Sequence, residues 1–300
     1  PDLDNQTVAG YDFITQPDRA RDGNGRDANP NDDGDWRAQD ECPFNPRQSD
    51  SSWHGTHVAG IAAAQANNGI GVVGLAYGAK IQHVRVLGRC GGTTADIADG
   101  IIWASGGSVT GVPNNATPSR VINLSLGGMG GCGPTYQNAI NQARARGAVV
   151  IAAAGNDNSP ATQFTPANCS GAISVAASTR QGTRAPYSNY GEGIDIAAPG
   201  GDLSVSGASG IASTLNEGKT TATTPSYVYY QGTSMAAPFV AGAAALMIAR
   251  EPSLTPTKIE EVLLNSARPF PAASICTKGC GVGILDANAA ARAVGTNPTA

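Results

Sequence analysis

Residues 232–238 (GTSMAAP) place a serine where a nucleophile can be activated. Ser234 lies between a glycine-rich stretch and a run of small apolar residues that is typical of a buried helix. A helix N-terminus offers free N–H groups and a partial positive charge, which stabilise the oxyanion formed when a serine attacks a carbonyl group. Pro238 falls in the first turn, where its missing N–H costs little. Taken alone, the pattern is explained more simply by a serine that only caps the helix.

Two of the three histidines occur in one short motif, residues 54–60 (HGTHVAG). His54 and His57 are three positions apart and can share one helix face, so a zinc site is one interpretation. The Glu of a His-Glu-x-x-His motif is absent, and no other His or Cys pattern completes such a site. The third histidine, His83, lies in a β-branched strand and is interpreted as an ordinary core or surface residue.

Asn156 follows the apolar run 148–154 (AVVIAAA) directly after Gly155. The carboxyl edge of a parallel sheet is where α/β proteins form their ligand sites. The side-chain NH2 group of an asparagine there can donate a hydrogen bond to an oxyanion. The alternative is a simple turn residue, which is a common role for asparagine.

The elements that must position these residues alternate between strand and helix. We expect strands at 80–87, 121–126, 148–154 and 172–177, and helices at 58–64, 94–104, 135–146, 234–250, 255–267 and just after Asp286. The first 50 residues are mostly polar and are interpreted as loop, and 195–231 as strands and loops. This alternation predicts an α/β fold with a mostly parallel central sheet and helices on both faces.

Composition narrows the functional classes. The chain has 300 residues, of which 41% are hydrophobic and 14% charged, with a net charge of -4. There is no cluster of Lys and Arg, so we expect no nucleic-acid partner. No uninterrupted apolar run reaches the roughly 18 residues of a membrane span, so we expect no membrane insertion. Six cysteines, an even number, favour three disulfides and an oxidising compartment.

Four motifs occur in a fixed order along the chain: HGTHVAG at 54–60, NLSLGG at 123–128, AAGN at 153–156 and GTSMAAP at 232–238. In this order and over nearly the whole chain, the sequence resembles the subtilisin-like (subtilase) serine proteases, and among them secreted bacterial members. The resemblance implies a subtilisin-like α/β fold. It also implies a secreted, extracellular serine endopeptidase that forms an acyl-enzyme.

The resemblance assigns a role to each motif. Ser234 matches the nucleophile, His54 the general base, and Asn156 the side-chain donor of the oxyanion hole, with the backbone N–H of Ser234 as second donor. The segment that pairs with the substrate backbone, and the opposite wall of the specificity pocket, match Ser125, Leu126, Gly127 and Ala152, Ala153, Ala154, Gly155.

The acid that orients the histidine is not recognisable. In this family the order is Asp, His, Ser, and the Asp is followed by Thr or Ser and then Gly. Neither Asp-Thr-Gly nor Asp-Ser-Gly occurs, and the opening Pro1-Asp2-Leu3 matches a stretch that follows the family's Asp motif. We therefore expect residues 1–300 to be one subtilisin-like peptidase domain whose Asp motif lies upstream of Pro1. The alternative is a catalytically impaired, calcium-stabilised peptide-binding module.

Residues 128–133 (GMGGCG) satisfy the G-x-G-x-x-G pattern of dinucleotide-binding proteins, after a strand and before a helix. No Asp or Glu occurs between Gly133 and Asp157, so the usual partner of the ribose is missing. A nucleotide-dependent oxidoreductase is thus the weakest of the three hypotheses.

The acidic segment 22–35 suggests a structural Ca²⁺ site, because hard cations are bound by several carboxylate and carbonyl oxygens on a flexible loop. The candidate ligands are Asp22, Asp27, Asp32, Asp33 and Asp35. An EF-hand is excluded because the Glu at the twelfth position is missing, and a solvated acidic turn is the alternative. Calcium stabilisation, common among secreted members, adds support to the site.

Cys276 and Cys280 are close enough in sequence to form a local disulfide, while the family resemblance suggests Cys42–Cys90 and Cys132–Cys169. We expect protein or peptide substrates, with a propeptide or protein inhibitor as a further partner, and a monomeric protein.

Overall fold

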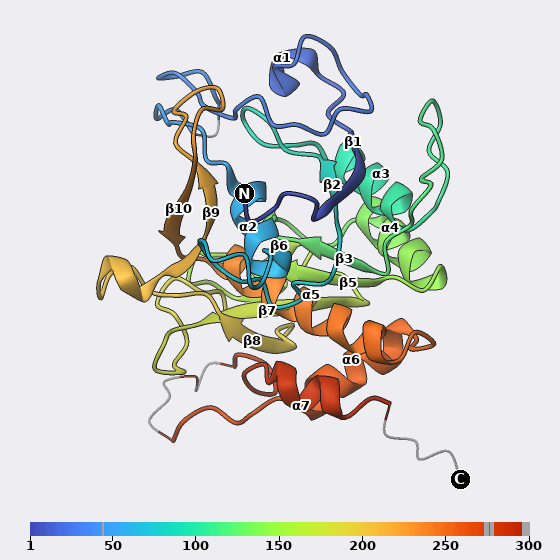
Figure 1. Cartoon of the computed structure of the whole chain (residues 1–300), viewed down its shortest axis with the longest axis vertical. Coiled ribbons are helices and arrows are strands. Elements are labelled where there is room, and N and C mark those ends of the chain that lie inside the picture. The colour runs from blue at the N-terminus through green and yellow to red at the C-terminus, as the bar shows by residue number, and fades with distance from the viewer. Residues whose placement is uncertain (44, 273–275, 277–278, 296–300) are drawn as a thin grey trace.

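The computed structural model describes the chain except residues 44, 273–275, 277–278 and 296–300 (Figure 1). Its centre is a four-stranded sheet in the order β3-β5-β7-β8, and every neighbouring pair is parallel. The strands are β3 (Val121–Leu124), β5 (Val149–Ala153), β7 (Ala172–Ser178) and β8 (Ile196–Pro199). The predicted parallel sheet is confirmed, and three of its four strands lie in predicted strand segments.

Helices cover both faces of this sheet, and strand β5 shows why its sequence is continuously apolar. Val149 and Ile151 point into one core cluster, which they share with α5 (Thr233–Arg250), α6 (Pro256–Asn265) and α7 (Ala287–Arg292). Val150 and Ala152 point into the other, with α3 (Thr94–Ala104) and α4 (Pro134–Ala145). Because alternate residues of a strand face opposite sides, a strand buried on both faces needs apolar residues at every position.

Helix α5 is the central helix of the molecule. By length and composition alone it could cross a membrane, but 61% of the apolar stretch is buried inside the fold. It packs against β3, β5, β7 and β8 and against α2 (His54–Ala63). Its small residues allow this close packing on several sides, so its apolar character is explained by the core.

A second, two-stranded parallel sheet includes a strand that the sequence did not predict, although the rest of the first 50 residues is mostly loop as expected. Strand β1 (Thr7–Asp12) pairs with β2 (Ile81–Arg85), and the short helix α1 (Pro17–Ala20) follows β1. The rings of Tyr11 and Phe13 pack against Trp103, with centroids 5.8 and 5.7 Å from the indole. Tyr11 in this strand and Phe13 just after it stand within a polar sequence, which is why the strand was not predicted.

A β-hairpin leads into α5 and also contacts α2. Its strands, β9 (Ile211–Asn216) and β10 (Pro225–Tyr230), are antiparallel, and β9 packs on α2 (Figure 1). The remaining short elements are β4 (Gly128–Met129), β6 (Phe164–Thr165), η1 (Ala161–Gln163) and η2 (Gly207–Ser209). Helix α2 begins at His54, four residues before the predicted start at Val58.

The three predicted disulfides, Cys42–Cys90, Cys132–Cys169 and Cys276–Cys280, are all formed in the structure. The first joins the loop before α2 to the segment after β2, and the second joins the start of α4 to the segment before β7.

Candidate active site

Ser234 is the second residue of α5, as the glycine-rich sequence before it predicts. Gly232 is the N-cap, with φ at +151°, and Pro238 lies inside the helix, past the first turn in which the sequence analysis placed it. The backbone N–H groups of Met235 and Ala236 donate to the carbonyl oxygen of Gly232 at 3.0 and 3.3 Å. The N–H of Ser234 makes no such bond in the described chain, so it is available to a ligand at the positive end of the helix.

Asn156 follows β5 and is held through its oxygen. Its Oδ1 accepts from the backbone N–H of Thr233 at 2.8 Å and from the Thr233 hydroxyl at 3.0 Å. The same hydroxyl accepts from the N–H of Gly155 at 3.1 Å. Because the oxygen is occupied, the NH2 group points away from Thr233 and is free to donate. Thr233 is a site residue that the sequence did not single out, and its only signal is its place beside Ser234.

The two donors border one small space at the start of α5. A side chain at Gly232 would meet both of them, because its Cβ would lie 3.5 Å from Nδ2 of Asn156 and 3.6 Å from the backbone nitrogen of Ser234. Two N–H groups beside one point form the arrangement that stabilises a developing oxyanion. The oxyanion roles of Asn156 and Ser234 stay predictions, and the proximity of these two N–H groups is compatible with them.

His54 is the first residue of α2, and α2 packs against α5 (Figure 1). Burial lowers the pKa of His54, and the negative charge of Asp35 acts in the opposite direction. The neutral imidazole is the form that can accept a proton. Among the described residues, the Ser234 hydroxyl donates to the carbonyl oxygen of Ser125 at 3.3 Å and does not bond to His54. Catalytic hydrogen bonds are often long or unformed without substrate.

His57 does not join His54 in a metal site. It is fully buried, its Nε2 lies 3.0 Å from the carbonyl oxygen of Val228, and its ring stacks on Tyr230 with centroids 4.6 Å apart. Burial lowers the pKa of His57 to about 4. His57 is thus a core residue that joins α2 to the hairpin, and the zinc interpretation loses its second ligand.

The segment predicted to pair with substrate backbone follows β3. Gly127 is exposed, and Ser125 and Leu126 are half-buried. The Ser125 hydroxyl donates to the carbonyl oxygen of Ser234 at 2.7 Å, which joins this segment to α5. Pairing of a peptide with this segment as a further strand stays a prediction, and Gly127 is its exposed residue.

The opposite wall differs in accessibility from residue to residue. Ala152 and Ala154 are fully buried and Ala153 nearly so, while Gly155 is partly accessible with φ at +106°. A side chain at Gly155 would press on Asn189 at 2.2 Å and on Phe164 at 3.3 Å. Of this predicted set, Gly155 and the backbone around it can therefore contact a ligand, whereas the side chains of Ala152 and Ala154 belong to the core.

The five candidate calcium ligands do not meet at one point. Asp22 and Asp32 lie 3.3 and 3.6 Å from the guanidinium of Arg85, which also pairs with the buried Asp12 at 2.6 Å. The others have separate surroundings: Asp27 accepts from Asn24, Asp33 is exposed, and Asp35 bonds to Ser52.

A guanidinium among three carboxylates occupies the place that a cation would take, so these side chains do not fit Ca²⁺ as they stand. Burial raises the pKa of Asp12 to about 6, against the charge of Arg85. Within the described ranges, no group of three or more His, Cys, Asp or Glu side chains is arranged to hold a metal ion. The geometry does not support the predicted ligand set.

The glycine-rich segment 128–133 has the wrong topology for a dinucleotide-binding site. Strand β4 pairs antiparallel with β6 and does not belong to the central parallel sheet, although Gly133 does cap α4. A Rossmann fingerprint requires a strand of the parallel sheet directly before the helix.

Fold and site together define a subtilisin-like protein, and the comparisons with known proteins agree. The sequence profile of the Subtilase family matches residues 4–290, and the chain belongs to this family. It is 55% identical over 293 residues to an "Extracellular protease" of Xanthomonas campestris pv. campestris, covering 97% of this chain and 49% of that protein. It is 45% identical to an "Extracellular basic protease" of Dichelobacter nodosus, covering 98% and 48%. The chain thus spans about half the length of these relatives.

Solved structures give the same family. A structure of proteases from Pseudoalteromonas arctica PAMC 21717 is 55% identical, with a TM-score of 0.94 over 97% of this chain and 85% of that one. A cold-adapted subtilisin-like serine proteinase is 28% identical, with a TM-score of 0.67 over 95% and 83%. The subtilisin-like fold is therefore shown by both sequence and structure.

Proposed function

We propose that this protein is a secreted serine endopeptidase in which Ser234 attacks the peptide carbonyl and His54 takes its proton. The observation that carries the proposal is the pair of donors, Asn156 Nδ2 and the Ser234 backbone N–H, beside one point at the N-terminus of α5. Such donors serve a reaction that develops negative charge on an oxygen, which peptide hydrolysis through a tetrahedral intermediate does.

The reaction divides among residues already described. Peptide substrate lies along Ser125–Gly127 with its side chain beside Gly155, and its carbonyl oxygen faces the two donors. His54 accepts the proton of Ser234 as the serine oxygen bonds to the carbonyl carbon, and it returns the proton to the leaving amine. The resulting acyl-enzyme is hydrolysed by water, with His54 again as base.

A fluorophosphonate probe tests this proposal, because it reacts only with an activated serine. We expect the full-length protein to be labelled and Ser234→Ala to be unlabelled and unable to cleave casein. Absence of labelling in the correctly folded parent would reject the protease and favour the peptide-binding module.

Secretion is part of the proposal, supported by the names of the extracellular relatives and by the three disulfides. We also assign residues 1–300 to one peptidase domain that acts as a monomer, with a propeptide or protein inhibitor as a further partner. The triad acid upstream of Pro1 stays an expectation from the family order, and the coding sequence ahead of Pro1 tests it.

Structural calcium stays a prediction that rests on the family resemblance and not on the five aspartates. It is tested by thermal unfolding with and without EDTA, in which we expect the chelator to lower the melting temperature. An unchanged melt would remove calcium from the proposal.

A further inference from the structure

We propose that Asp35 is a positioning residue for His54 and that it acts through Ser52. The inference rests on the proposed function, because it concerns the reaction in which His54 is the base. Asp35 grips Ser52 with both of its oxygens: Oδ1 accepts from the backbone N–H of Ser52 at 2.6 Å and Oδ2 from its hydroxyl at 2.7 Å. One carboxylate therefore fixes both the backbone and the side chain of a residue two positions before His54.

Ser52 in turn contacts the start of α2. Its Oγ accepts from the backbone N–H of His54 at 3.4 Å, and its carbonyl oxygen accepts from the hydroxyl of Tyr230 at 3.0 Å. The N-cap residue Trp53 provides no side-chain cap for the helix. Ser52 thus satisfies the first free N–H of α2, and Asp35 and the hairpin together determine where Ser52 lies.

Trp53, between Ser52 and His54, is also fixed. Its backbone is left-handed, with φ 47° and ψ 31°, and its buried indole N–H donates to the carbonyl oxygen of Gly218 at 2.6 Å. A bulky residue holds this conformation only where its surroundings impose it. The two residues that precede His54 are therefore fixed by several independent contacts. These contacts determine the backbone conformation at His54 and so the orientation of its side chain.

The charge of Asp35 adds an electrostatic effect to the mechanical one. A negative charge near a helix N-terminus is favourable, and here it also raises the pKa of His54 against the effect of burial. The other titratable groups around it are the ring of His57, whose pKa is lowered to about 4, and the phenol of Tyr230, whose pKa is raised by burial. Both are neutral at pH 7, so among the described residues Asp35 is the charge that acts on His54, and its effect adds to that of the triad acid expected upstream of Pro1.

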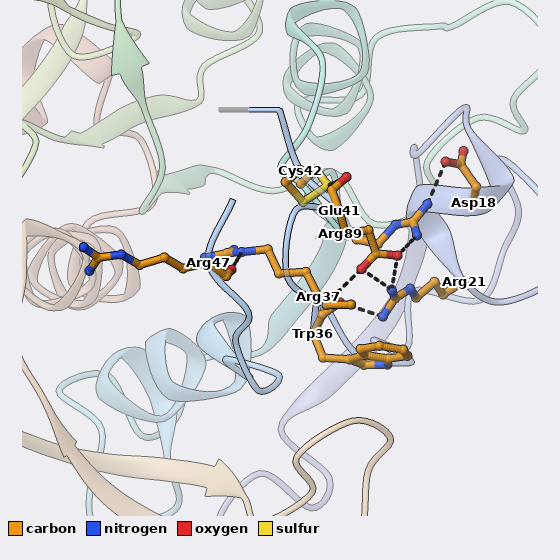
Figure 2. The surroundings of a disulfide bond; sticks show 10 residues. Asp18, Arg21, Trp36, Arg37, Glu41, Cys42, Arg47 and Arg89 are labelled. Atoms are coloured by element: carbon orange, nitrogen blue, oxygen red, sulfur yellow. Dashed lines mark hydrogen bonds and ion pairs between the residues drawn. A yellow bond between two sulfur atoms is a disulfide. The ribbon is translucent and has the colours of Figure 1, made fainter. Parts of the chain in front are cut away.

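The cluster beside the Cys42–Cys90 disulfide includes the residue that follows Asp35 in the chain (Figure 2). The next residue, Trp36, has its carbonyl oxygen bonded to Arg21 at 2.6 Å and its ring 3.7 Å below the guanidinium of Arg21. Figure 2 shows Arg21 and Arg89 converging on Glu41, the neighbour of Cys42. Asp35, whose carboxylate bonds to Ser52, therefore lies next to a segment that ion pairs and the Cys42–Cys90 disulfide hold in place.

The experiment compares Asp35→Asn, Asp35→Glu and Ser52→Ala in the full-length protein, with Asp50→Asn as the control. Asp50 is a charge-matched choice, because it lies in the same loop, is exposed, and among the described residues makes only a 3.8 Å ion pair with Lys219. The measurements are kcat, KM and the pH dependence of kcat/KM for a peptide substrate, with near-UV circular dichroism to confirm the fold.

We expect Asp35→Asn to lower kcat roughly 10-fold with little change in KM, because the base is displaced but substrate contacts remain. Its acid limb should move to lower pH, because the charge that raised the pKa of His54 is gone. Ser52→Ala should lower kcat but leave the acid limb in place, since the carboxylate is retained. Asp35→Glu should keep the acid limb of the pH profile of kcat/KM where the parent has it, because the carboxylate is retained. Asp50→Asn should resemble the parent in kcat, KM and pH profile.

A folded Asp35→Asn variant with the kcat and acid limb of Asp50→Asn would overturn the inference. If Asp35→Asn does not fold, Ser52→Ala decides, and parental kcat in that variant would equally overturn it. Failure of the proposed function is distinguished by the parent itself, which would then show no labelling that depends on Ser234.

Discussion

Ser234 is the second residue of a helix that is largely buried against the central sheet, whereas His54 is the first residue of a helix whose N-terminus contacts polar loops. On the serine side, α5 packs between β3, β5, β7 and β8 and the helices around it, and Thr233 joins Asn156 to the same helix. On the histidine side, Asp35 and Tyr230 hold Ser52, and the supporting loop is cross-linked by Cys42–Cys90.

The difference indicates that apolar packing positions the proposed nucleophile and that polar contacts position the proposed base. Apolar packing is insensitive to pH and is lost only as the core unfolds. Polar contacts depend on charge and on a few hydrogen bonds, so single substitutions in loops can affect the base without unfolding the protein.

The largest expected effect is on the serine side, at the oxyanion donor. Asn156→Ala should lower kcat by roughly 10²–10³-fold, a magnitude that comes from a subtilisin, a member of this family. The exposed neighbour Asp157→Ala is the control and should keep nearly parental kcat. Steady-state cleavage of a chromogenic peptide measures both, and a loss confined to KM would contradict a donor that acts on the transition state.

Removing one disulfide near His54 and one away from it tests whether the two regions are held in place differently. The pairs Cys42–Cys90 and Cys132–Cys169 span 48 and 37 residues, so replacing either pair by serines should lower the unfolding free energy by a similar amount, about 2–4 kcal/mol. Their kinetic effects should differ. Loss of Cys42–Cys90 should lower kcat, because it frees the support of Asp35, whereas loss of Cys132–Cys169 should raise KM, because it frees the segments around β4 and β6. If both disulfide variants change kcat and KM in the same way, the proposed difference between the two regions is wrong.

The buried contact between α2 and the hairpin should depend on pH. The pKa of His57 is near 6.5 in an unfolded chain and about 4 in the fold. The unfolded chain therefore binds the proton more readily between these values, and the stabilisation present above pH 6.5 is lost as the pH falls towards 4, by on the order of 3 kcal/mol.

Denaturant unfolding of the parent and of His57→Gln at several pH values isolates this contribution. The comparison is between the two proteins because Asp12, whose pKa is raised to about 6, contributes with the opposite sign over much of the same range. Parallel curves for the two proteins would contradict a buried neutral His57.

The smallest effect is expected at Thr233, which fixes the orientation of Asn156. Thr233→Val removes the hydroxyl that bonds to Asn156 and Gly155, which should cost about 1–3 kcal/mol of stability and lower kcat roughly 10-fold. Thr233→Ser retains the hydroxyl and is the control. Equal kcat values for the two variants would show that the backbone bond to Asn156 is sufficient.

Local sequence signals predicted elements well where one short segment contained the whole cause. Thr255 and Asp286 cap α6 and α7 as expected, accepting from Lys258 and Ala289 at 3.2 and 2.8 Å. Strand β1 was missed because its apolar residues stand next to a long acidic loop, and its partner β2 lies far along the chain.

The sequence by itself determined the family and the start of the helix that carries the proposed nucleophile, because glycine, small residues and an apolar strand impose the start of α5 and the turn at Asn156 locally. Only the tertiary structure decided what the acidic residues do. Charge and loop composition suggested one calcium site, but the fold carries Asp22 and Asp32 to Arg85 and Asp35 to Ser52. A carboxylate can satisfy its charge with many partners, and which of them it meets depends on contacts between segments that no local pattern records.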